Sequence, residues 1–289
     1  GGGPAGTFLA WKLAEHGVDV AVIEEDPQIG NPSCCGGLVG IKGMKELGFR
    51  KEDWVISTVS RAEFVSPNGS SIEFKAEPQA WVINRPAFDR ELAERALAAG
   101  ATIFLKTRGM EVTVKKIPKI RTQGFVSDEI FCDVLVGADG PTSRLARRFV
   151  SRREYFFCSQ AEISNTWEQD KVAVWLGKSI APGFFAWAIP GGEITRVGLG
   201  CTSGNPLSLL KTHPFCRQTA VRVLSICSGL IPRFFVSSPG AGRTLLVGDA
   251  AGQVKPMTGG GLYYGLSCSA LAADVIAERL ASPDIEKIG

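Results

Sequence analysis

Hydrophobic positions recur along the chain in two different periods, one typical of helices and one typical of strands. Apolar residues at helical spacing predict three helices, in a stretch after Gly6 that ends at Gly17, over 86–99 and over about 262–280. Short β-branched runs predict buried strands at 18–23, 102–105, 131–136 and 244–247. Between about residues 151 and 235 the pattern changes to strand-like segments separated by Pro/Gly turns, at 171–176, 184–189 and 196–199.

The first helix is preceded by a glycine-rich turn, Gly1-Gly2-Gly3-Pro4-Ala5-Gly6, and followed by a strand that closes on Glu24. In this G-x-G-x-x-G arrangement the first glycine makes a tight turn, Gly3 lets the backbone approach a pyrophosphate, and Gly6 lets helix and strand pack closely. The helix N-terminus offers unpaired N–H groups to phosphate, and the acid accepts a hydrogen bond from a ribose hydroxyl. Gly1, Gly3, Ala5, Gly6 and Glu24 are therefore predicted to bind a dinucleotide.

The elements predict an α/β fold in which a Rossmann-like cofactor domain is interrupted by an antiparallel β-sheet domain. The cofactor domain is expected over residues 1–150 and 236–289, and the inserted substrate domain over 151–235, with strands also contributed by about 52–83. No strand precedes Gly1, although a parallel sheet of this kind needs its central strand. We therefore expect the sequence to be truncated at its N-terminus.

Composition narrows the chemistry. The 289 residues are 45% hydrophobic and 21% charged, which excludes a disordered chain or a coiled coil. A net charge of +3, spread along the sequence, gives no footprint for nucleic acid. Of the eight cysteines, Cys34 and Cys35 are adjacent and the other six are scattered, without a C-x-x-C motif, which predicts free, mostly buried thiols in a reducing compartment. Only two histidines are present, so we expect no metal site and no Ser-His-Asp triad, and assign the chemistry to a cofactor.

Two further pairs of glycine and acid follow predicted strands, Ala138-Asp139-Gly140 and Gly248-Asp249. Together with the first glycine turn, their order and spacing resemble the FAD-binding fold of the para-hydroxybenzoate hydroxylase type. The resemblance implies FAD as the cofactor. It further implies that Asp249 holds the ribityl chain and that the glycine-rich start of the following helix lies beside the flavin ring.

Four stretches resemble the geranylgeranyl reductase family more closely, which includes the digeranylgeranylglycerophospholipid reductases of archaea. They are the loop 32–37 (P-S-C-C-G-G), the helix start 84–89 (N-R-P-A-F-D), the segment 182–190 (P-G-F-F-A-W-A-I-P) with V-G-L-G at 197–200, and the glycine segment 248–261. The match implies that Cys35, Trp187 and Phe185 are catalytic or line the substrate. The cofactor-binding residues it implies, beyond those of the first turn, are Cys35, Gly36, Gly37, Arg85, Gly109, Asp139, Asp249, Gly260, Gly261 and Leu262.

The sequence departs from this family pattern at two positions and at its end. Phe185 stands where the family usually has tyrosine, and Ile189 where it often has phenylalanine. The loss of a phenol removes a proton donor or an orienting hydrogen bond. The family usually continues into a C-terminal helical region, so we expect truncation at the C-terminus as well.

The resemblance implies an FAD-dependent oxidoreductase acting on CH–CH groups, which reduces C=C bonds of geranylgeranyl chains by hydride transfer from flavin N5. The alternatives are an FAD-dependent monooxygenase of an apolar small molecule and a non-catalytic flavin-binding fragment. NAD(P)H, F420 and ferredoxin all stay open as the electron donor. The expected partners are an isoprenoid or polyprenyl lipid and a ferredoxin-type donor, with no nucleic acid. A cytoplasmic protein in peripheral contact with a membrane is expected, since no apolar run is long enough to span one.

Overall fold

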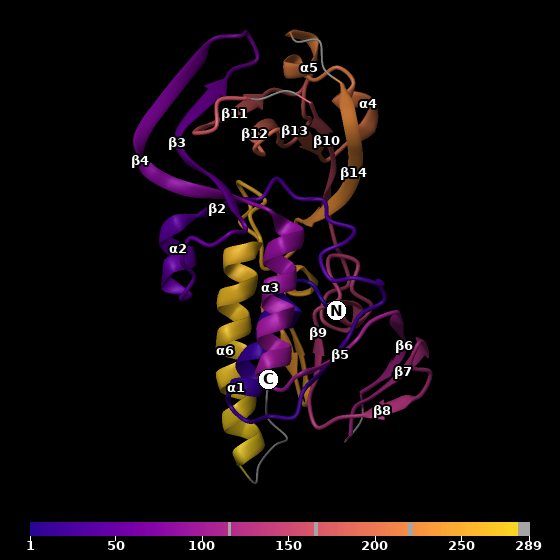
Figure 1. The fold of residues 1–289 in the computed structure, drawn as a ribbon. Helices are drawn as coiled ribbons and strands as arrows, with labels where there is room; N and C mark the ends of the chain where they lie inside the picture. The colour runs from indigo at the N-terminus through magenta and orange to yellow at the C-terminus, as the bar shows by residue number, and fades with distance from the viewer. Residues whose placement is uncertain (115–116, 165–166, 219–221, 283–289) are drawn as a thin grey trace. The chain divides into compact units, whose positions relative to one another are not determined.

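A computed structural model describes residues 1–114, 117–164, 167–218 and 222–282 (Figure 1). The chain forms two compact units, each assembled from separate segments. Unit 1 contains 1–32, 86–154 and 232–289, and unit 2 contains 33–85 and 155–231. The second unit therefore takes in residues 33–51 as well as the expected 52–83. Which unit binds the cofactor and which the substrate stays a prediction.

Unit 1 contains several short strands and three long helices, two of which, the first and the last, pack against each other. Its helices are α1 (Pro4–Glu15), α3 (Arg85–Ala98, whose first residue belongs to unit 2), η1 (Leu145–Arg148), η2 (Gly248–Ala251) and α6 (Leu262–Ala281). Its strands are β1 (Ala21–Ile23), β5 (Thr102–Phe104), β6 (Thr107–Thr113), β7 (Lys119–Gly124), β8 (Glu129–Phe131), β9 (Leu135–Gly137), β15 (Gly240–Ala241) and β16 (Thr244–Leu246).

Parallel pairing of β1 with β5 and of β9 with β16 brings distant segments of unit 1 together. Buried apolar residues of α1, α6 and the strand ends form a shared core that includes Leu9, Leu13, Val247 and Ile276. The helix predictions are confirmed. α1 ends at Glu15, with His16 as its C-cap and Gly17 at φ +75, as a glycine stop requires. The prediction of one strand over 131–136 is wrong.

That segment divides between two sheets. β8 pairs with β7 at the edge of an antiparallel sheet, whereas β9 begins four residues later and pairs with β16. Between them, Cys132 N–H donates to the Pro118 carbonyl and Asp133 forms an ion pair with Arg243. The hydrophobic run carries no sign of this change of partner, which long-range pairing decides.

Unit 2 is built on one eight-stranded sheet in the order β14-β10-β13-β12-β11-β3-β4-β2. The strands are β2 (Leu38–Gly40), β3 (Val55–Val65), β4 (Ser71–Ile83), β10 (Tyr155–Ile163), β11 (Lys171–Leu176), β12 (Phe185–Pro190), β13 (Thr195–Cys201) and β14 (Val223–Pro232). Its helices are α2 (Ile41–Glu46), α4 (Pro206–Leu210) and α5 (Pro214–Gln218). The strands from β10 to β2 in this order pair antiparallel as expected, except that β3 and β11 run parallel.

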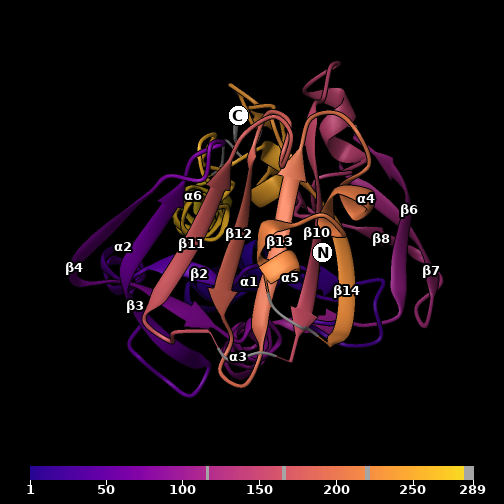
Figure 2. The same cartoon turned by 90° about the horizontal axis from the view of Figure 1, so that it is seen from above.

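The two faces of this sheet differ. α4 and α5 lie over one face (Figure 2), where Leu210 and Phe215 pack with Ala186, Ala188 and the other inward residues of the central strands. Because successive side chains of a strand point to opposite faces, Trp187 and Ile189 belong to the other face. There Ile189 packs with Val59, Val82 and Val172. None of the helices in the described part of the chain is long and apolar enough to cross a membrane.

Candidate flavin and substrate sites

The glycine turn of unit 1 is packed tightly on two sides and open on the third. A Cβ at Gly1 would collide with the backbone of Ala138, and one at Gly6 would collide with the Gly1 carbonyl. At Gly3, by contrast, no described atom lies within 4 Å of the point where a Cβ would stand. Gly3 is also the N-cap of α1 and has no side chain to cap it. The Thr7 hydroxyl donates to the Gly3 carbonyl at 3.1 Å, and no described side chain accepts from the N–H groups of the first turn. Open backbone at the positive end of a helix fits a pyrophosphate.

Glu24 is held against this turn. Its Oε2 accepts a hydrogen bond from Gly2 N–H at 2.5 Å, and its Oε1 accepts one from Asp26 N–H at 2.8 Å. Each oxygen keeps a further lone pair, so the carboxylate can still accept from a ribose hydroxyl. Burial, and then the charges of Glu24 and Glu25, raise the pKa of Asp26 above its ordinary value.

Gly109 lies in β6, whose first residue Thr107 donates its N–H to the Glu24 carbonyl at 2.8 Å. β6 thus begins beside the end of β1. A Cβ at Gly109 would press on the Ile120 side chain of β7, 2.7 Å away. The structure therefore supplies a packing reason for this glycine, and its contact with the cofactor stays a prediction.

Asp139 follows β9 and closes a turn. Its Oδ2 accepts a hydrogen bond from Arg144 N–H at 3.0 Å, which holds the loop that leads into η1. The adjacent Ala138 carbonyl and Asp139 Cα flank the place of a Cβ on Gly1, so this turn packs directly on the first glycine turn. The turn role is visible in the structure, and a cofactor role of Asp139 stays a prediction.

The second glycine segment places the Asp249 side chain beside the N-terminus of α6. Asp249 lies in η2, and its Oδ1 is 3.0 Å from the point where a Cβ of Gly261 would stand. Gly261 caps α6, Leu262 begins that helix, and no described side chain caps it. Around Gly260 the nearest described atoms to a Cβ position are at 3.5 Å or more. This is a second helix N-terminus with open backbone, beside a carboxylate.

Small residues allow the N-terminal parts of α1 and α6 to lie close together. A Cβ on Gly265 of α6 would lie 3.4 Å from Gly248 Cα and 3.6 Å from Ala5 Cβ. Ser269 on α6 donates its hydroxyl to the Ala5 carbonyl at 2.9 Å. Ala5 is thus a packing residue between α1, η2 and α6. The donor set, two open helix N-termini and two carboxylates, fits an FAD molecule, whose phosphates and hydroxyls need amide donors and acceptors.

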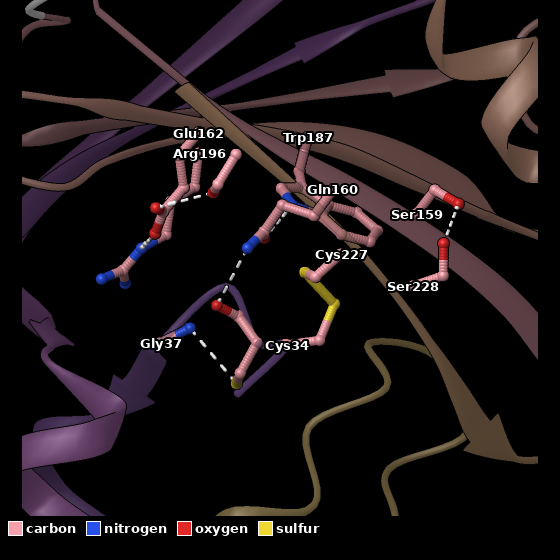
Figure 3. Close-up of a disulfide and its surroundings, with 11 residues drawn as sticks. Cys34, Gly37, Ser159, Gln160, Glu162, Trp187, Arg196, Cys227 and Ser228 are labelled. Carbon is pink, nitrogen blue, oxygen red and sulfur yellow. Dashed lines mark hydrogen bonds and ion pairs between the residues drawn. A yellow bond between two sulfur atoms is a disulfide. The ribbon is translucent and has the colours of Figure 1, made fainter. Parts of the chain in front are cut away.

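In unit 2, the loop 34–37 is fixed to the sheet at several points (Figure 3). Cys34 forms a disulfide with Cys227 of β14, with a Cα–Cα distance of 5.6 Å. The prediction that all cysteines are free is therefore wrong for this pair. The cysteines lie 193 residues apart in the sequence. Cys34 precedes β2, which stands at the opposite end of the strand order from β14, so neither sequence spacing nor strand pairing reveals this bond.

Cys35, Gly36 and Gly37 contact the sheet with their backbone. The Cys35 carbonyl accepts from Gln160 Nε2 at 3.2 Å, and the Gly36 carbonyl accepts from Arg196 Nη1 at 3.1 Å. Gly37, at φ +73, donates its N–H to Cys35 Sγ at 3.3 Å. Its conformation and the nearness of the Ile83 carbonyl leave no room for a Cβ.

Arg196 is the charged side chain that holds the loop 34–37 to the sheet. Its guanidinium is buried, and Nη1 also donates to the Ile83 carbonyl at 3.0 Å. Burial lowers the pKa of Arg196 below its ordinary value, the charges of Cys35 and Glu162 oppose that change, and the positive charge of Arg85 reinforces it. Arg85 thus belongs to the same electrostatic neighbourhood in unit 2.

Trp187 and Phe185 belong to an aromatic cluster for which glycines make room. Gly198 pairs with Trp187 across β12 and β13, and a Cβ there would enter the indole ring. A Cβ on Gly200 would likewise meet Phe184 at 2.6 Å. Phe185 stacks on Phe184 with ring centroids 4.1 Å apart and meets Trp187 edge-on at 5.9 Å. The two glycines of the V-G-L-G segment therefore leave the space that the aromatic rings occupy.

Sequence reasoning missed Gln160, Arg196 and the disulfide. Gln160 and Arg196 are polar residues in strand segments, and each is less than a tenth exposed. A buried polar residue in a strand is the one signal that points to them, because such a group must find hydrogen-bond partners. Residue types alone did not reveal that their partners lie in the loop 34–37.

Residues 1–193 match the model of the FAD binding domain family. A geranylgeranyl bacteriochlorophyll reductase-like protein from Thermoplasma acidophilum has the same fold, with a TM-score of 0.89 at 26% identity over 99% of this chain and 78% of that one. A flavin-dependent brominase superimposes with a TM-score of 0.83 over 100% of this chain and 81% of that one. Its 18% identity shows the fold alone. Fold and site thus define an FAD-dependent oxidoreductase.

Two curated relatives narrow the class. Digeranylgeranylglycerophospholipid reductases from Methanothrix thermoacetophila and Methanospirillum hungatei are 30% and 32% identical to the chain. The alignments cover 98% of this chain and 78% and 76% of those proteins. The chain belongs to the digeranylgeranylglycerophospholipid reductase family, with FAD as its cofactor. The predictions of fold class, cofactor and family are confirmed.

Proposed function

We propose that this protein reduces the isolated C=C bonds of geranylgeranyl chains in a lipid, with FAD bound by unit 1 and the isoprenoid chain bound by unit 2. The relatives of that name, which align with nearly the whole chain, support the reaction. The observation that carries the assignment of unit 2 is the aromatic cluster of Phe184, Phe185 and Trp187, for which Gly198 and Gly200 make room. Such a surface suits an apolar chain without polar handles.

The cofactor site is proposed to use the open backbone of unit 1. The N-terminus of α1 at Gly3 would hold the pyrophosphate, and Glu24 the adenosine ribose. Asp249 would hold the ribityl chain, with Gly260, Gly261 and Leu262 giving backbone contacts to the ring. Bound FAD in its reduced form supplies a hydride to one carbon of the double bond.

The residues of unit 2 are proposed to do the remaining work. An isolated alkene has no carbonyl to polarise, so catalysis depends on orientation, exclusion of water and a proton for the second carbon. Trp187 and Phe185 would orient the chain by their ring faces and keep water away. Cys35 Sγ would hold the proton, since its loop is fixed at Gly36 and Gly37. Phe185 carries no hydroxyl, so at that position it contributes shape only.

A lipid substrate also implies contact with a lipid surface. The hairpin of β3 and β4 exposes three large apolar side chains, Phe64, Ile72 and Phe74, of which Ile72 is 63% exposed. Phe64 and Phe74 meet edge-on with ring centroids 5.8 Å apart. Exposed apolar groups of this kind favour peripheral membrane contact, which we include in the proposal. A ferredoxin-type protein, NAD(P)H and F420 stay open as the electron donor.

The residue at position 146 argues against the alternative of an FAD-dependent monooxygenase. The hydroxylase signature D-G-x-x-S-x-x-R would begin at Asp139 and require arginine at position 146. Ala146 stands there, fully buried, and donates its N–H to Ser143 Oγ at 3.0 Å. An arginine would have no room in that core, and Arg147 next to it is exposed.

Anaerobic stopped-flow absorbance tests the proposal. The FAD-loaded protein is reduced with dithionite and mixed with digeranylgeranyl glycerophospholipid, and the matched control is the same lipid with saturated chains. We expect flavin reoxidation with the unsaturated lipid alone. Reoxidation only after oxygen is admitted, coupled to a hydroxylated product, would support the monooxygenase instead. Bound flavin that neither reduces the unsaturated lipid nor gives a hydroxylated product with oxygen would indicate a non-catalytic flavin-binding fragment.

A further inference from the structure

Gln160 connects two parts of the substrate site that the sequence places far apart. Its side chain lies between the Cys35 loop and the aromatic segment of β12 (Figure 3). Nε2 donates to the Cys35 carbonyl at 3.2 Å, and Oε1 accepts from Trp187 Nε1 at 3.1 Å. Two of the three residues proposed to be catalytic, Cys35 and Trp187, are therefore hydrogen-bonded to one amide group.

The orientation of this amide is fixed by its partners. An indole N–H can only donate, and a backbone carbonyl can only accept. A flipped amide would place its NH2 group against the Trp187 N–H and its oxygen against the Cys35 carbonyl, so both hydrogen bonds would be lost. Gln160 is 4% exposed, and water cannot readily replace either partner. The side chain thus has one arrangement that satisfies it.

Other described contacts also hold the loop, and none of them involves Trp187. Arg196 binds the Gly36 carbonyl, the disulfide binds Cys34 to β14, and the Gly37 carbonyl accepts from Ile83 N–H at 2.8 Å. These contacts fix the loop to the sheet whether or not the indole is in place. Among the described contacts of this loop, only the one with Gln160 links the loop to the Trp187 indole. The Gln160 amide hydrogen-bonds to the Cys35 carbonyl through Nε2 and to the indole N–H through Oε1.

We propose that Gln160 is a positioning residue, which fixes the Cys35 backbone and the Trp187 indole relative to each other for reduction of the isoprenoid double bond. The inference rests on the proposed function. The loop then presents the Cys35 thiol at a set distance from the ring that orients the alkene. A side chain of equal length without the amide leaves the fold in place and uncouples the two residues.

The test uses the FAD-loaded Gln160→Met protein, with Gln79→Met as the matched control. Gln79 is an exposed strand residue of unit 2, and its Nε2 donates to the nearby Glu77 carbonyl at 2.7 Å. Iodoacetamide labelling followed by peptide mass spectrometry measures the reactivity of the Cys35 thiol, with Cys132 of unit 1 as internal reference. Anaerobic stopped-flow measures the rate constant of alkene-dependent flavin reoxidation.

For Gln160→Met we expect faster labelling of Cys35, unchanged labelling of Cys132 and unchanged FAD affinity. The reoxidation rate constant should fall by about 10-fold to 100-fold, the effect expected of a misplacement near 1 Å. Gln79→Met should match the wild type in all four measurements. Wild-type labelling and wild-type reoxidation in Gln160→Met would overturn the inference.

Trp187→Phe gives a second, independent test should the first variant not fold. It removes the indole N–H and keeps an aromatic ring, so it should also accelerate labelling of Cys35, a residue in a distant segment. Unchanged labelling in Trp187→Phe would contradict the inference. If no variant or wild-type protein reacts with the alkene but labelling changes as expected, the positioning role stands and the proposed reaction fails.

Discussion

Acid should destabilise unit 2 through one buried histidine. His213 is fully buried, its Nδ1 accepts a hydrogen bond from Phe215 N–H at 3.1 Å, and its ring meets Trp175 edge-on at 5.0 Å. Burial lowers the pKa of His213 from 6.5 to about 4. The unfolded chain takes up the proton near pH 6.5, whereas the folded protein resists it down to about pH 4. Stability should therefore be lost as the pH falls through this window and be unaffected above it.

The size of the effect follows from the gap between the two pKa values. At about 1.4 kcal/mol for each pH unit, complete protonation costs about 3 kcal/mol of unfolding free energy, and about 2 kcal/mol is lost between pH 8 and pH 5. Urea unfolding followed by tryptophan fluorescence measures it, because five of the six tryptophans belong to unit 2. His213→Asn keeps an acceptor for Phe215 N–H and removes the titration.

The difference between pH 8 and pH 5 should therefore be about 2 kcal/mol smaller in His213→Asn than in the wild type. The other histidine, His16, supplies the control, since it is exposed and lies in unit 1. His16→Asn should retain the acid sensitivity of the wild type. Equal acid sensitivity in His213→Asn and the wild type would refute the reasoning.

Three further variants test the two sites. Gly3→Ala should fold normally, because its Cβ enters open space, but lower FAD affinity by about 10-fold or more by filling the pyrophosphate position, measured by fluorescence titration. Gly198→Val should lower the unfolding free energy by about 1–3 kcal/mol and slow alkene-dependent reoxidation, because its side chain displaces the neighbouring indole. Replacing both Cys34 and Cys227 by serine should lower the unfolding free energy by up to about 5 kcal/mol, since the bond closes a long loop.

Each of these predictions has a control. Gly40→Ala makes the same change at the open N-terminus of α2 in unit 2 and should leave FAD affinity unchanged. Equal FAD affinity in Gly3→Ala and the wild type would contradict the pyrophosphate assignment. Gly198→Val with wild-type stability and turnover would show that the indole is free to move. Titration of eight thiols, instead of six, in the unreduced denatured protein would exclude the Cys34–Cys227 bond.

The local elements of unit 1 could be predicted because short-range patterns determine them. The Gly17 stop, the start of α3 near Pro86 and the glycine turn before α1 depend on backbone rules that act within a few residues. The division of 131–136 between β8 and β9 depends on strands far away in the sequence, and the run itself contains no information on which partner each half takes.

Site residues that lie within sequence motifs could be predicted, and those outside motifs could not. Cys35 and Trp187 could be named from their segments, but the group that joins them, Gln160, lies in a third segment without a motif. The same holds for Arg196 and for the partner of Cys34. Such contacts arise when the strands of the eight-stranded sheet take their order, which no local pattern encodes.

The most direct test of the central claim is the mass of the lipid product. FAD-loaded protein is reduced anaerobically with dithionite, incubated with digeranylgeranyl glycerophospholipid, and the extracted lipid is analysed by mass spectrometry. The account predicts stepwise gain of one H2 for each double bond, in amounts that match the flavin reoxidised. A lipid recovered at its original mass while the flavin stays bound and reduced would contradict it.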